Sequence, residues 1–138
     1  MLKDLESIHK LCFPDKPWTA NDFADLKKSG CEIIAGDNGF IVWRVVGDEA
    51  EIITIGVAPS ARRTGIAAAM LTIAENEIKK SGANKIFLEV AANNTAALKL
   101  YEKHGYVQIG TRPEYYNYAD LSTGALAKVD ARILAKDI

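Results

Sequence analysis

The chain has 138 residues, of which 49% are hydrophobic and 25% charged, as in ordinary soluble globular domains. This composition excludes a disordered charged tail, a collagen-like fibre and a coiled-coil rod. The 17 Lys and Arg residues nearly balance the 18 Asp and Glu residues, so no overall positive field attracts nucleic acid or an anionic membrane. We therefore expect one domain over residues 1–138 that binds neither nucleic acid nor membranes directly.

The first part of the chain predicts two helices. Apolar residues recur at helical spacing over residues 2–12, and Pro14 ends this pattern. Thr19, followed three residues later by Asp22, is typical of a capped helix start, and we expect this second helix to end near Gly30.

Three strands are predicted next. The apolar runs Cys31–Ala35 and Phe40–Val46 flank Gly36-Asp37-Asn38-Gly39, whose Asn-Gly pair favours a hairpin turn. After a second turn at Gly47, the run Ala50–Val57 is rich in Ile and predicts a third strand. We therefore expect this part of the chain to form strands joined by hairpins.

The longest helix is predicted from Ile66 to about Ser81. Its apolar positions cover one broad face, as an amphipathic helix packed on a sheet requires: Ile66, Ala67, Met70, Leu71, Ile73, Ala74 and Ile78. Asn94 or Thr95 can cap a further helix, which runs to His104.

The remaining runs predict strands around these helices. Lys85–Val90 separates the two helices, and Tyr106–Gly110 and Val129–Lys136 complete the strands. An irregular, Tyr-rich loop is expected over about residues 112–128. Hairpin strands followed by strand, helix, strand, helix and strand predict the α+β (or α/β) class, a mixed sheet with helices on its faces.

The start of the chain and its cysteines indicate the compartment. Met1-Leu2-Lys3-Asp4-Leu5-Glu6 is charged where a signal peptide needs an apolar run, and no stretch approaches the ~20 apolar residues of a membrane span. The two cysteines, Cys12 and Cys31, have neither C-x-x-C nor His-ligand spacing. We therefore expect reduced thiols, a cytoplasmic protein and no metal.

The segment over residues 57–67 joins a strand end to a helix start, where free backbone N–H groups and the helix dipole attract anions. Gly65 and Ala67 leave the backbone open to a phosphate, and Arg62 and Arg63 add positive charge. The segment matches neither the standard dinucleotide loop nor the NTPase loop. It predicts a phosphate site, with a solvated Arg-Arg connection as the alternative.

Two segments resemble a known family. Arg62-x-x-Gly65-x-Ala67 resembles the R/Q-x-x-G-x-G/A signature of the GNAT superfamily of acetyl-CoA-dependent N-acetyltransferases. Leu88-Glu89-Val90 and the run from Asn94 to Tyr106 are similar to the L-E-V and N-x-x-A-x-x-L-Y-x-x-x-G-F segments of its RimI-type group, the bacterial ribosomal-protein alanine N-acetyltransferases. The resemblance implies a GNAT-type, mostly antiparallel twisted sheet flanked by helices, with acetyl-CoA as co-substrate and no metal.

The resemblance also implies which residues bind acetyl-CoA. In the family, the strand before the loop splays from its neighbour and pairs with the pantetheine arm, while loop amides wrap the pyrophosphate. The residues expected to bind acetyl-CoA are Ile55, Gly56, Val57, Arg62, Arg63, Thr64, Gly65, Ile66, Ala67, Ala68 and Asn94. The alternatives are a core strand for Ile55 and Val57, and an ordinary helix N-cap for Asn94.

Acetyl transfer to an amine requires two proton movements, because the attacking amine must lose a proton and the departing thiolate is better expelled when protonated. Glu89 lies between Leu88 and Val90 on a short apolar strand and is a candidate general base, acting directly or through a water. The phenol of Tyr101 can protonate sulfur, and the resemblance assigns base and acid to these same two positions. The alternatives are a solvent-facing Glu89 and a core Tyr101 with its hydroxyl at the rim.

Two shorter segments indicate the acceptor side. Phe13-Pro14…Trp18 and Arg112-x-x-Tyr115-Tyr116 resemble the F-P-W and R-x-x-Y-Y segments of the RimI-type group. Trp18, Tyr115 and Tyr116 are candidate walls around an incoming peptide end, since aromatic faces with polar tips suit a partly wet groove. A core or rim position is the alternative for each.

The leading hypothesis is a monomeric or homodimeric enzyme that transfers acetyl from acetyl-CoA directly to a protein N-terminal α-amine, an alanine of a ribosomal protein. The alternatives are an acetyltransferase for lysine or a small amine, a non-catalytic acetyl-CoA-binding module, and a ribosome- or nucleic-acid-binding domain. The chain opens with a helix where the family usually has a strand, so the sheet is expected to lack that strand. Ala91 stands where the RimI-type group often has Arg, which removes a potential acceptor contact.

Overall fold

The computed structural model describes residues 2–13, 17–119 and 126–138, with side chains described over 5–13, 17–114 and 128–138. The elements follow the chain in this order: α1 (Leu2–Cys12), α2 (Ala20–Lys28), β1 (Cys31–Ala35), β2 (Gly39–Val46), β3 (Glu49–Val57), the short 3-10 helix η1 (Pro59–Ala61), α3 (Ile66–Lys80), β4 (Lys85–Ala91), α4 (Thr95–Lys103), β5 (Val107–Ala119) and β6 (Leu126–Asp137). The predicted helices and the first four predicted strands are thus confirmed.

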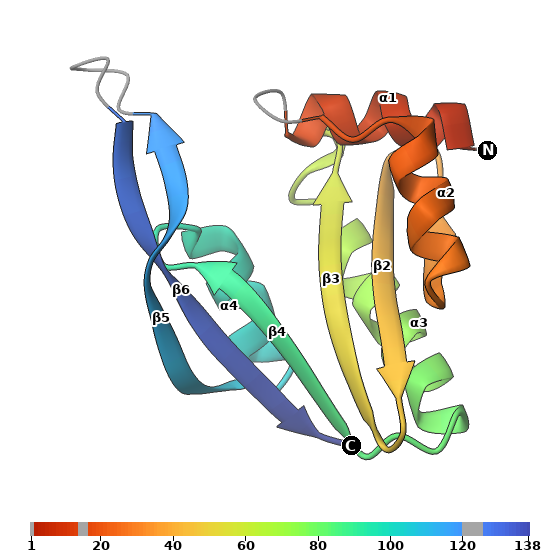
Figure 1. The fold of residues 1–138 in the computed structure, drawn as a ribbon, viewed down its shortest axis with the longest axis vertical. Coiled ribbons are helices and arrows are strands. Elements are labelled where there is room, and N and C mark those ends of the chain that lie inside the picture. The colour runs from red at the N-terminus through yellow and green to blue at the C-terminus, as the bar shows by residue number, and fades with distance from the viewer. Residues whose placement is uncertain (1, 14–16, 120–125) are drawn as a thin grey trace.

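The six strands form one sheet in the order β1-β2-β3-β4-β6-β5 (Figure 1). Every neighbouring pair is antiparallel except β3 and β4, which run parallel because α3 carries the chain back across the sheet. The predicted mixed, mostly antiparallel sheet flanked by helices is confirmed, and α1 is the first element within the described residues.

The parallel pair β3 and β4 separates partway along its length. Register partners run from Glu49↔Lys85 to Ile52↔Leu88, although β3 continues to Val57 and β4 to Ala91. Beyond Leu88 the two strands diverge and the sheet opens into a V between them (Figure 1). We call this gap the β3–β4 opening.

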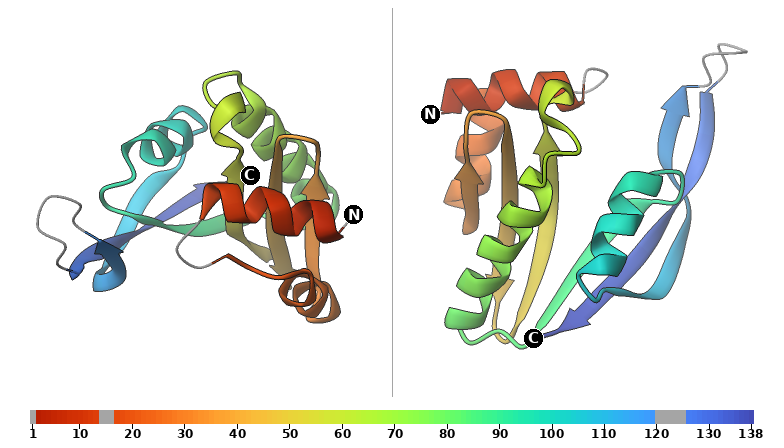
Figure 2. Two further views of the ribbon diagram at one scale, coloured as in Figure 1. Left: turned by 90° about the horizontal axis from the view of Figure 1, so that it is seen from above. Right: turned by 180° about the vertical axis from the view of Figure 1, so that it is seen from behind.

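Helices lie on both faces of the sheet. On one face α3 packs on β2 and β3, and α4 lies over the β4 half (Figure 2). On the other face α1 and α2 pack against β1, β2 and β3 (Figure 1). Over the described residues no helix lies on that second face of β4, β6 and β5 (Figure 1).

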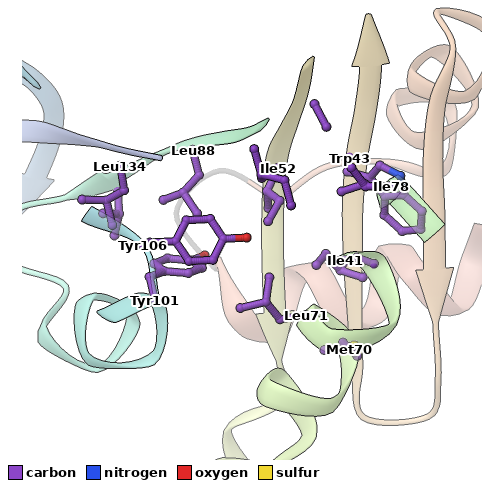
Figure 3. Close-up of a cluster of buried hydrophobic side chains, with 14 of the residues drawn as sticks. Ile41, Trp43, Ile52, Met70, Leu71, Ile78, Leu88, Tyr101, Tyr106 and Leu134 are labelled. Atoms are coloured by element: carbon purple, nitrogen blue, oxygen red, sulfur yellow. The ribbon is translucent and has the colours of Figure 1, made fainter. Parts of the chain in front are cut away.

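The larger core cluster lies between the sheet, α3 and α4 (Figure 3). It joins Ile41 and Ile52 of the first half of the sheet to Leu88 of β4, with Leu71 of α3 and Tyr101 of α4 beneath them. Fully burying one such aliphatic side chain is worth about 1.5–3 kcal/mol. Because the cluster includes residues from both halves, it holds the sheet together at the base of the opening.

A smaller core cluster lies under α1 and α2: Leu5, Ile8, Phe23, Cys31, Phe40 and Val42. The start of α2 is fixed as predicted, because the Thr19 hydroxyl accepts the Asp22 N–H at 3.2 Å while the Asp22 carboxylate accepts the Thr19 N–H at 2.8 Å. This capping box positions α2 against the sheet.

The irregular loop expected over residues 112–128 is wrong over residues 112–119 and 126–128, which are strand, while residues 120–125 lie outside the described part of the chain. Strand β5 continues to Ala119 and pairs with β6 from Leu126 onward. The first register shift, at 108–110, leaves Ile109 without a register partner next to Gly110, and the second, at 112–116, includes Pro113; Gly and Pro both favour a loop prediction. Tyr is a strong strand former, and pairing resumes at Tyr116 after the second bulge.

Within the described part of the chain, none of the helices has the length and apolar character that a membrane crossing requires. Over the same residues no group of three or more His, Cys, Asp and Glu side chains is placed to hold a metal ion. Cys12 and Cys31 are both free thiols.

Candidate functional site

The first wall of the β3–β4 opening is the end of β3. Strand β2 pairs with one edge of β3 as far as Val57, whereas within the described residues the edge facing β4 has no strand partner beyond Ile52. Ile55 and Val57 pack on the larger core cluster, which agrees with the alternative interpretation of this segment as a core strand. An edge of unpaired N–H and C=O groups is what an extended, amide-containing ligand needs.

Gly56 faces the opposite side of β3. A Cβ on Gly56 would lie 2.6 Å from Cε1 of the Phe40 ring and 3.1 Å from the Cys12 sulfur. The absence of a side chain therefore lets α1 and Phe40 pack directly behind the strand that lines the opening.

The loop after β3 leads to an uncapped helix start. Gly65, the N-cap of α3, has a left-handed φ of 84° and provides no side-chain cap. The Ala69 N–H donates to the Gly65 carbonyl at 3.0 Å, so the preceding amides of Ile66, Ala67 and Ala68 lie in the turn that has no intrahelical acceptors. These amides and the helix dipole make the start of α3 suited to an anion, and the phosphate site itself stays a prediction.

Arg63 is the other left-handed residue of this loop, with φ of 65°. For a residue with a Cβ this conformation costs about 1–2 kcal/mol, so the turn is held by its surroundings rather than by local preference. The hydroxyl of Thr64 donates to the Ala61 carbonyl and closes the loop below it. No sequence pattern around Arg63 indicates this glycine-like conformation.

Arg62 bends back toward β3 instead of projecting from the loop. Its Nε donates to the Val57 carbonyl at 3.2 Å, and its guanidinium also hydrogen-bonds the Cys12 thiol. Burial raises the pKa of Cys12, although the nearby Arg62 charge opposes that change. A protonated thiol is a poor acyl carrier, which favours direct transfer over a route through Cys12.

Asn94 is the N-cap of α4, on the second wall of the opening. Its Oδ1 accepts the Ala97 N–H at 3.2 Å, so the ordinary capping role is present. The side-chain NH2 group is a separate donor and can bind a ligand while the cap is intact.

Glu89 lies directly beyond Leu88, the last β4 residue that pairs with β3, while β4 stays paired with β6 as far as Ala91. Leu88 and Val90 are buried on the α4 side, so Glu89 points to the opposite face, where it is 23% exposed. Its Oε1 lies 2.7 Å from Nη2 of Arg112 on β5. The sequence pattern placed Arg112 in the R-x-x-Y-Y segment but did not predict its contact with Glu89.

Tyr101 lies on the other side of β4. It is 5% exposed in the larger core cluster, and its ring meets Tyr106 edge to face with 5.7 Å between centroids (Figure 3). Glu89 and Tyr101 therefore do not share a face of the sheet. A group held in the β3–β4 opening can nevertheless be approached by Glu89 from one face and by Tyr101 from the other.

A groove of about 650 Å³ lies between α3 and α4. Its lining includes Ala68 of the first turn of α3, Lys99 and Lys103 of α4, and His104. The sequence reading did not single out the two lysines, because a charge on an exposed helix face carries no distinguishing pattern.

The structure describes the three residues predicted to surround the acceptor peptide to different extents. Trp18 is half-buried against the smaller cluster, where it stacks on His9 with 4.6 Å between ring centroids. Its backbone N–H donates to Nδ1 of His9 at 2.9 Å, so it is anchored to α1. The backbones of Tyr115 and Tyr116 belong to β5, and their side chains lie outside the part of the structure that is described.

Comparison with protein families gives one match that covers most of the chain. Residues 2–106 match the acetyltransferase (GNAT) family. A [ribosomal protein bS18]-alanine N-acetyltransferase of Escherichia coli K12 is 36% identical over 99 residues, which make up 72% of this chain and 63% of that protein. The chain thus matches less than two thirds of the length of this curated relative.

Solved structures show the same fold. The ribosomal-protein-S18-alanine N-acetyltransferase from Escherichia coli superposes with a TM-score of 0.84 at 30% identity, over 99% of this chain and 87% of that one. An acetyltransferase from Bacillus subtilis in complex with CoA superposes with a TM-score of 0.75 at 23% identity, over 98% and 91% of the two chains. The mixed sheet and the helices that flank it, as described over residues 2–13, 17–119 and 126–138, are therefore the GNAT fold, as predicted.

Proposed function

The chain belongs to the acetyltransferase (GNAT) family, and from that premise we propose that it transfers acetyl from acetyl-CoA to a protein N-terminal α-amine, an alanine of a ribosomal protein. The observation that carries the proposal is the β3–β4 opening, which has an unpaired strand edge, an uncapped helix start and Glu89 around it. The acceptor follows from similarity to an enzyme named for alanine acetylation of ribosomal protein bS18. We expect a monomer or homodimer that acts in the cytoplasm and uses no metal.

The donor end of the site is proposed to bind acetyl-CoA. The edge of β3 over Ile55, Gly56 and Val57 offers backbone groups to the amides of the pantetheine arm. The remaining binding residues lie at the loop, the start of α3 and the start of α4: Arg62, Arg63, Thr64, Gly65, Ile66, Ala67, Ala68 and Asn94. Amides at a helix start favour the pyrophosphate because both the N–H groups and the dipole attract negative charge.

The proposed chemistry divides two proton transfers between the two faces of β4. Glu89 takes the proton that the acceptor ammonium must lose, and the amine nitrogen then attacks the thioester carbonyl carbon. After the attack the nitrogen still carries one proton more than the amide product. As the carbon–sulfur bond breaks, the Tyr101 phenol gives its proton to the departing thiolate, and the extra nitrogen proton passes through solvent to the tyrosinate and restores the phenol. Glu89 returns its proton to bulk water after the product leaves. The acceptor enters on the face of Glu89, with Trp18, Tyr115 and Tyr116 proposed as its aromatic surroundings.

Mass spectrometry tests this function. The protein is incubated with acetyl-CoA and peptides that share an internal lysine but begin with Ala, Ser or Gly, or with an already acetylated Ala. Acetyl on the α-amine of the Ala-led peptide is the expected result, and the blocked peptide should gain nothing. Acetyl on the internal lysine alone would reject the N-terminal assignment and keep the enzyme class.

The same experiment separates the non-catalytic alternative. Saturable acetyl-CoA binding, measured by calorimetry, without transfer to any of the peptides or to the cognate ribosomal protein, would indicate a binding module. Absence of acetyl-CoA binding would contradict the donor site itself.

A further inference from the structure

The ion pair between Glu89 and Arg112 differs in its setting from the other Arg–Glu pair on the sheet. The Glu89 carboxylate is 23% exposed and lies 2.7 Å from the Arg112 guanidinium, whose side chain is 49% exposed, so the difference lies in the carboxylate and in the distance. In the other pair, Arg44 and Glu51 lie 3.4 Å apart with side chains 43% and 47% exposed. A short contact to a partly buried carboxylate is stronger and better oriented than an exposed one.

The sheet register explains how the two residues meet from strands that are not neighbours. Glu89 is the register partner of Ile133 on β6, and Arg112 is the partner of Ala131 on the same strand. Register partners share a face, so Arg112 and Glu89 lie on one face, two strands or about 10 Å apart. Ala131 is fully buried between them and bears only a methyl group, which leaves room for the long Arg112 side chain to cross.

The backbone next to Arg112 is also specialised. A register shift follows between Arg112 and Tyr116, and within it Glu114 has a left-handed φ of 50°. The Glu114 N–H donates to Oδ1 of Asp130 at 2.8 Å, which fixes the bulge to β6. Bulges of this kind re-aim side chains and are frequent beside active sites.

We propose that Arg112 is the positioning residue of the reaction. It holds the Glu89 carboxylate at the mouth of the β3–β4 opening, oriented to take a proton from the amine that receives the acetyl group. This inference rests on the proposed function. A carboxylate can accept about four hydrogen bonds, so its contact with Arg112 leaves room for a hydrogen bond from the substrate amine or from a bridging water. Removal of Arg112 lets Glu89 rotate into solvent and lose its alignment.

The test compares steady-state kinetics of wild type and Arg112→Ala with acetyl-CoA and an Ala-led peptide. We expect kcat to fall by about 10²-fold, as for small misplacements of a reacting group, with KM for acetyl-CoA unchanged. Millimolar guanidinium, well below denaturing concentration, should restore part of kcat in Arg112→Ala and have no effect on wild type. Arg112→Gln, which keeps part of the side-chain stem, is measured in parallel, and thermal melting verifies that both variants are folded.

Two controls make the result specific. Arg44→Ala removes the exposed pair at the other end of the sheet and should leave kcat unchanged. The double variant Glu89→Gln/Arg112→Ala should be no slower than Glu89→Gln alone, because residues that act as one unit are not additive.

Three outcomes overturn the inference while the proposed function stands. They are an unchanged kcat in folded Arg112→Ala, a loss that multiplies with that of Glu89→Gln, and a loss confined to the KM of the peptide, which would make Arg112 a binding residue. A wild-type protein that binds acetyl-CoA and transfers nothing contradicts the proposed function, and the inference fails with it.

Discussion

The Tyr106 hydroxyl donates a 2.9 Å hydrogen bond to Oε2 of Glu75, which joins the strand after α4 to the middle of α3. The same oxygen lies 3.0 Å from Nζ of Lys136, and Oε1 lies 3.7 Å from Nδ1 of His104. Burial, followed by the Glu75 charge and its hydrogen bond, raises the pKa of Tyr106 well above its ordinary value, so the phenol remains a donor. This polar cluster links the two halves of the sheet below the opening.

Tyr106→Phe should lower the free energy of unfolding by about 1–2 kcal/mol, because one hydrogen bond to a charged group is lost while Glu75 keeps Lys136. Glu75→Ala should cost more, since it leaves the half-buried Lys136 ammonium unpaired. Urea denaturation measures both. Glu77→Ala, which breaks an exposed pair with Lys80 on the same helix, is the control and should stay within about 0.5 kcal/mol of wild type.

Tyr101→Phe should lower kcat by about 10²–10⁴-fold, because the variant keeps the buried ring but loses the proton given to the thiolate. Acetyl-CoA affinity, measured by calorimetry, should not change. Tyr106→Phe is the matched control, as it removes a neighbouring phenol to which the proposed chemistry assigns no proton. Equal losses in the two variants would exclude a specific acid role for Tyr101.

Gly56→Ala should destabilise the protein by about 1–3 kcal/mol, because the new methyl group lies 2.6 Å from the Phe40 ring atom in a packed cluster. The midpoint of urea unfolding gives the measurement. At Gly36, in the β1–β2 turn, a methyl group would meet nothing within 4 Å, so Gly36→Ala should be close to neutral. Similar midpoints for both variants would contradict the packing described behind β3.

Substitutions at Asn94 separate helix capping from ligand binding. Asn94→Ala removes the cap on Ala97 and should cost about 1 kcal/mol of unfolding free energy together with acetyl-CoA affinity. Asn94→Asp keeps a capping oxygen, loses the NH2 donor and gains a negative charge, so its stability should be retained while its affinity for the anionic acetyl-CoA falls. Calorimetry of acetyl-CoA binding and urea unfolding give the two readouts. Wild-type affinity in Asn94→Asp would leave Asn94 as a cap alone.

His9 makes stability depend on pH. Burial lowers the pKa of His9, with the Asp22 charge opposing, so the unfolded chain binds a proton at a higher pH than the folded one. The free energy of unfolding should therefore fall as pH drops from about 7 through the ordinary histidine pKa near 6.5. Protonation also removes the acceptor for the Trp18 N–H, so Trp18 fluorescence should report the same transition.

His9→Asn isolates this effect, because an amide oxygen can accept the Trp18 N–H but does not titrate in this range. Urea unfolding at pH 7.5, 6.5 and 5.5 should give a smaller pH slope in the variant than in wild type. Identical slopes would assign the pH dependence to other groups.

Helix and strand positions were predictable where local chemistry and tertiary packing agree. The Thr19–Asp22 box, the Asn-Gly turn and the periodicity of α3 each require only neighbours in sequence, and each is confirmed. Ile73 shows the limit of periodicity, because it lies on the predicted apolar face of α3 and yet is 46% exposed. The sheet covers a narrower stripe of α3 than the sequence pattern suggests.

The separate segments of the site were predictable from the sequence, but the contacts between those segments were not. The loop before α3 and the Glu89 strand carry local patterns, whereas the Arg112–Glu89 contact depends on β6 lying between β4 and β5. The sequence positions of Arg112 and Glu89 do not indicate the strand order or the register that brings the two residues together. For the same reason the polar cluster around Glu75 was not predictable, because its members come from α3, the end of α4, the residue before β5, and β6.

The early end of the β3–β4 pairing makes the two walls of the opening unequal in length. Beyond Ile52 and Leu88 the strands diverge, so an extended molecule that pairs with one edge cannot keep pairing with the other. Each strand stays paired on its far edge, β3 with β2 and β4 with β6, but the edge that faces the opening runs over residues 53–57 of β3 and only over residues 89–91 of β4. A long substrate thus has one track to follow, and the second wall stays free for a reactant arriving from the uncovered face.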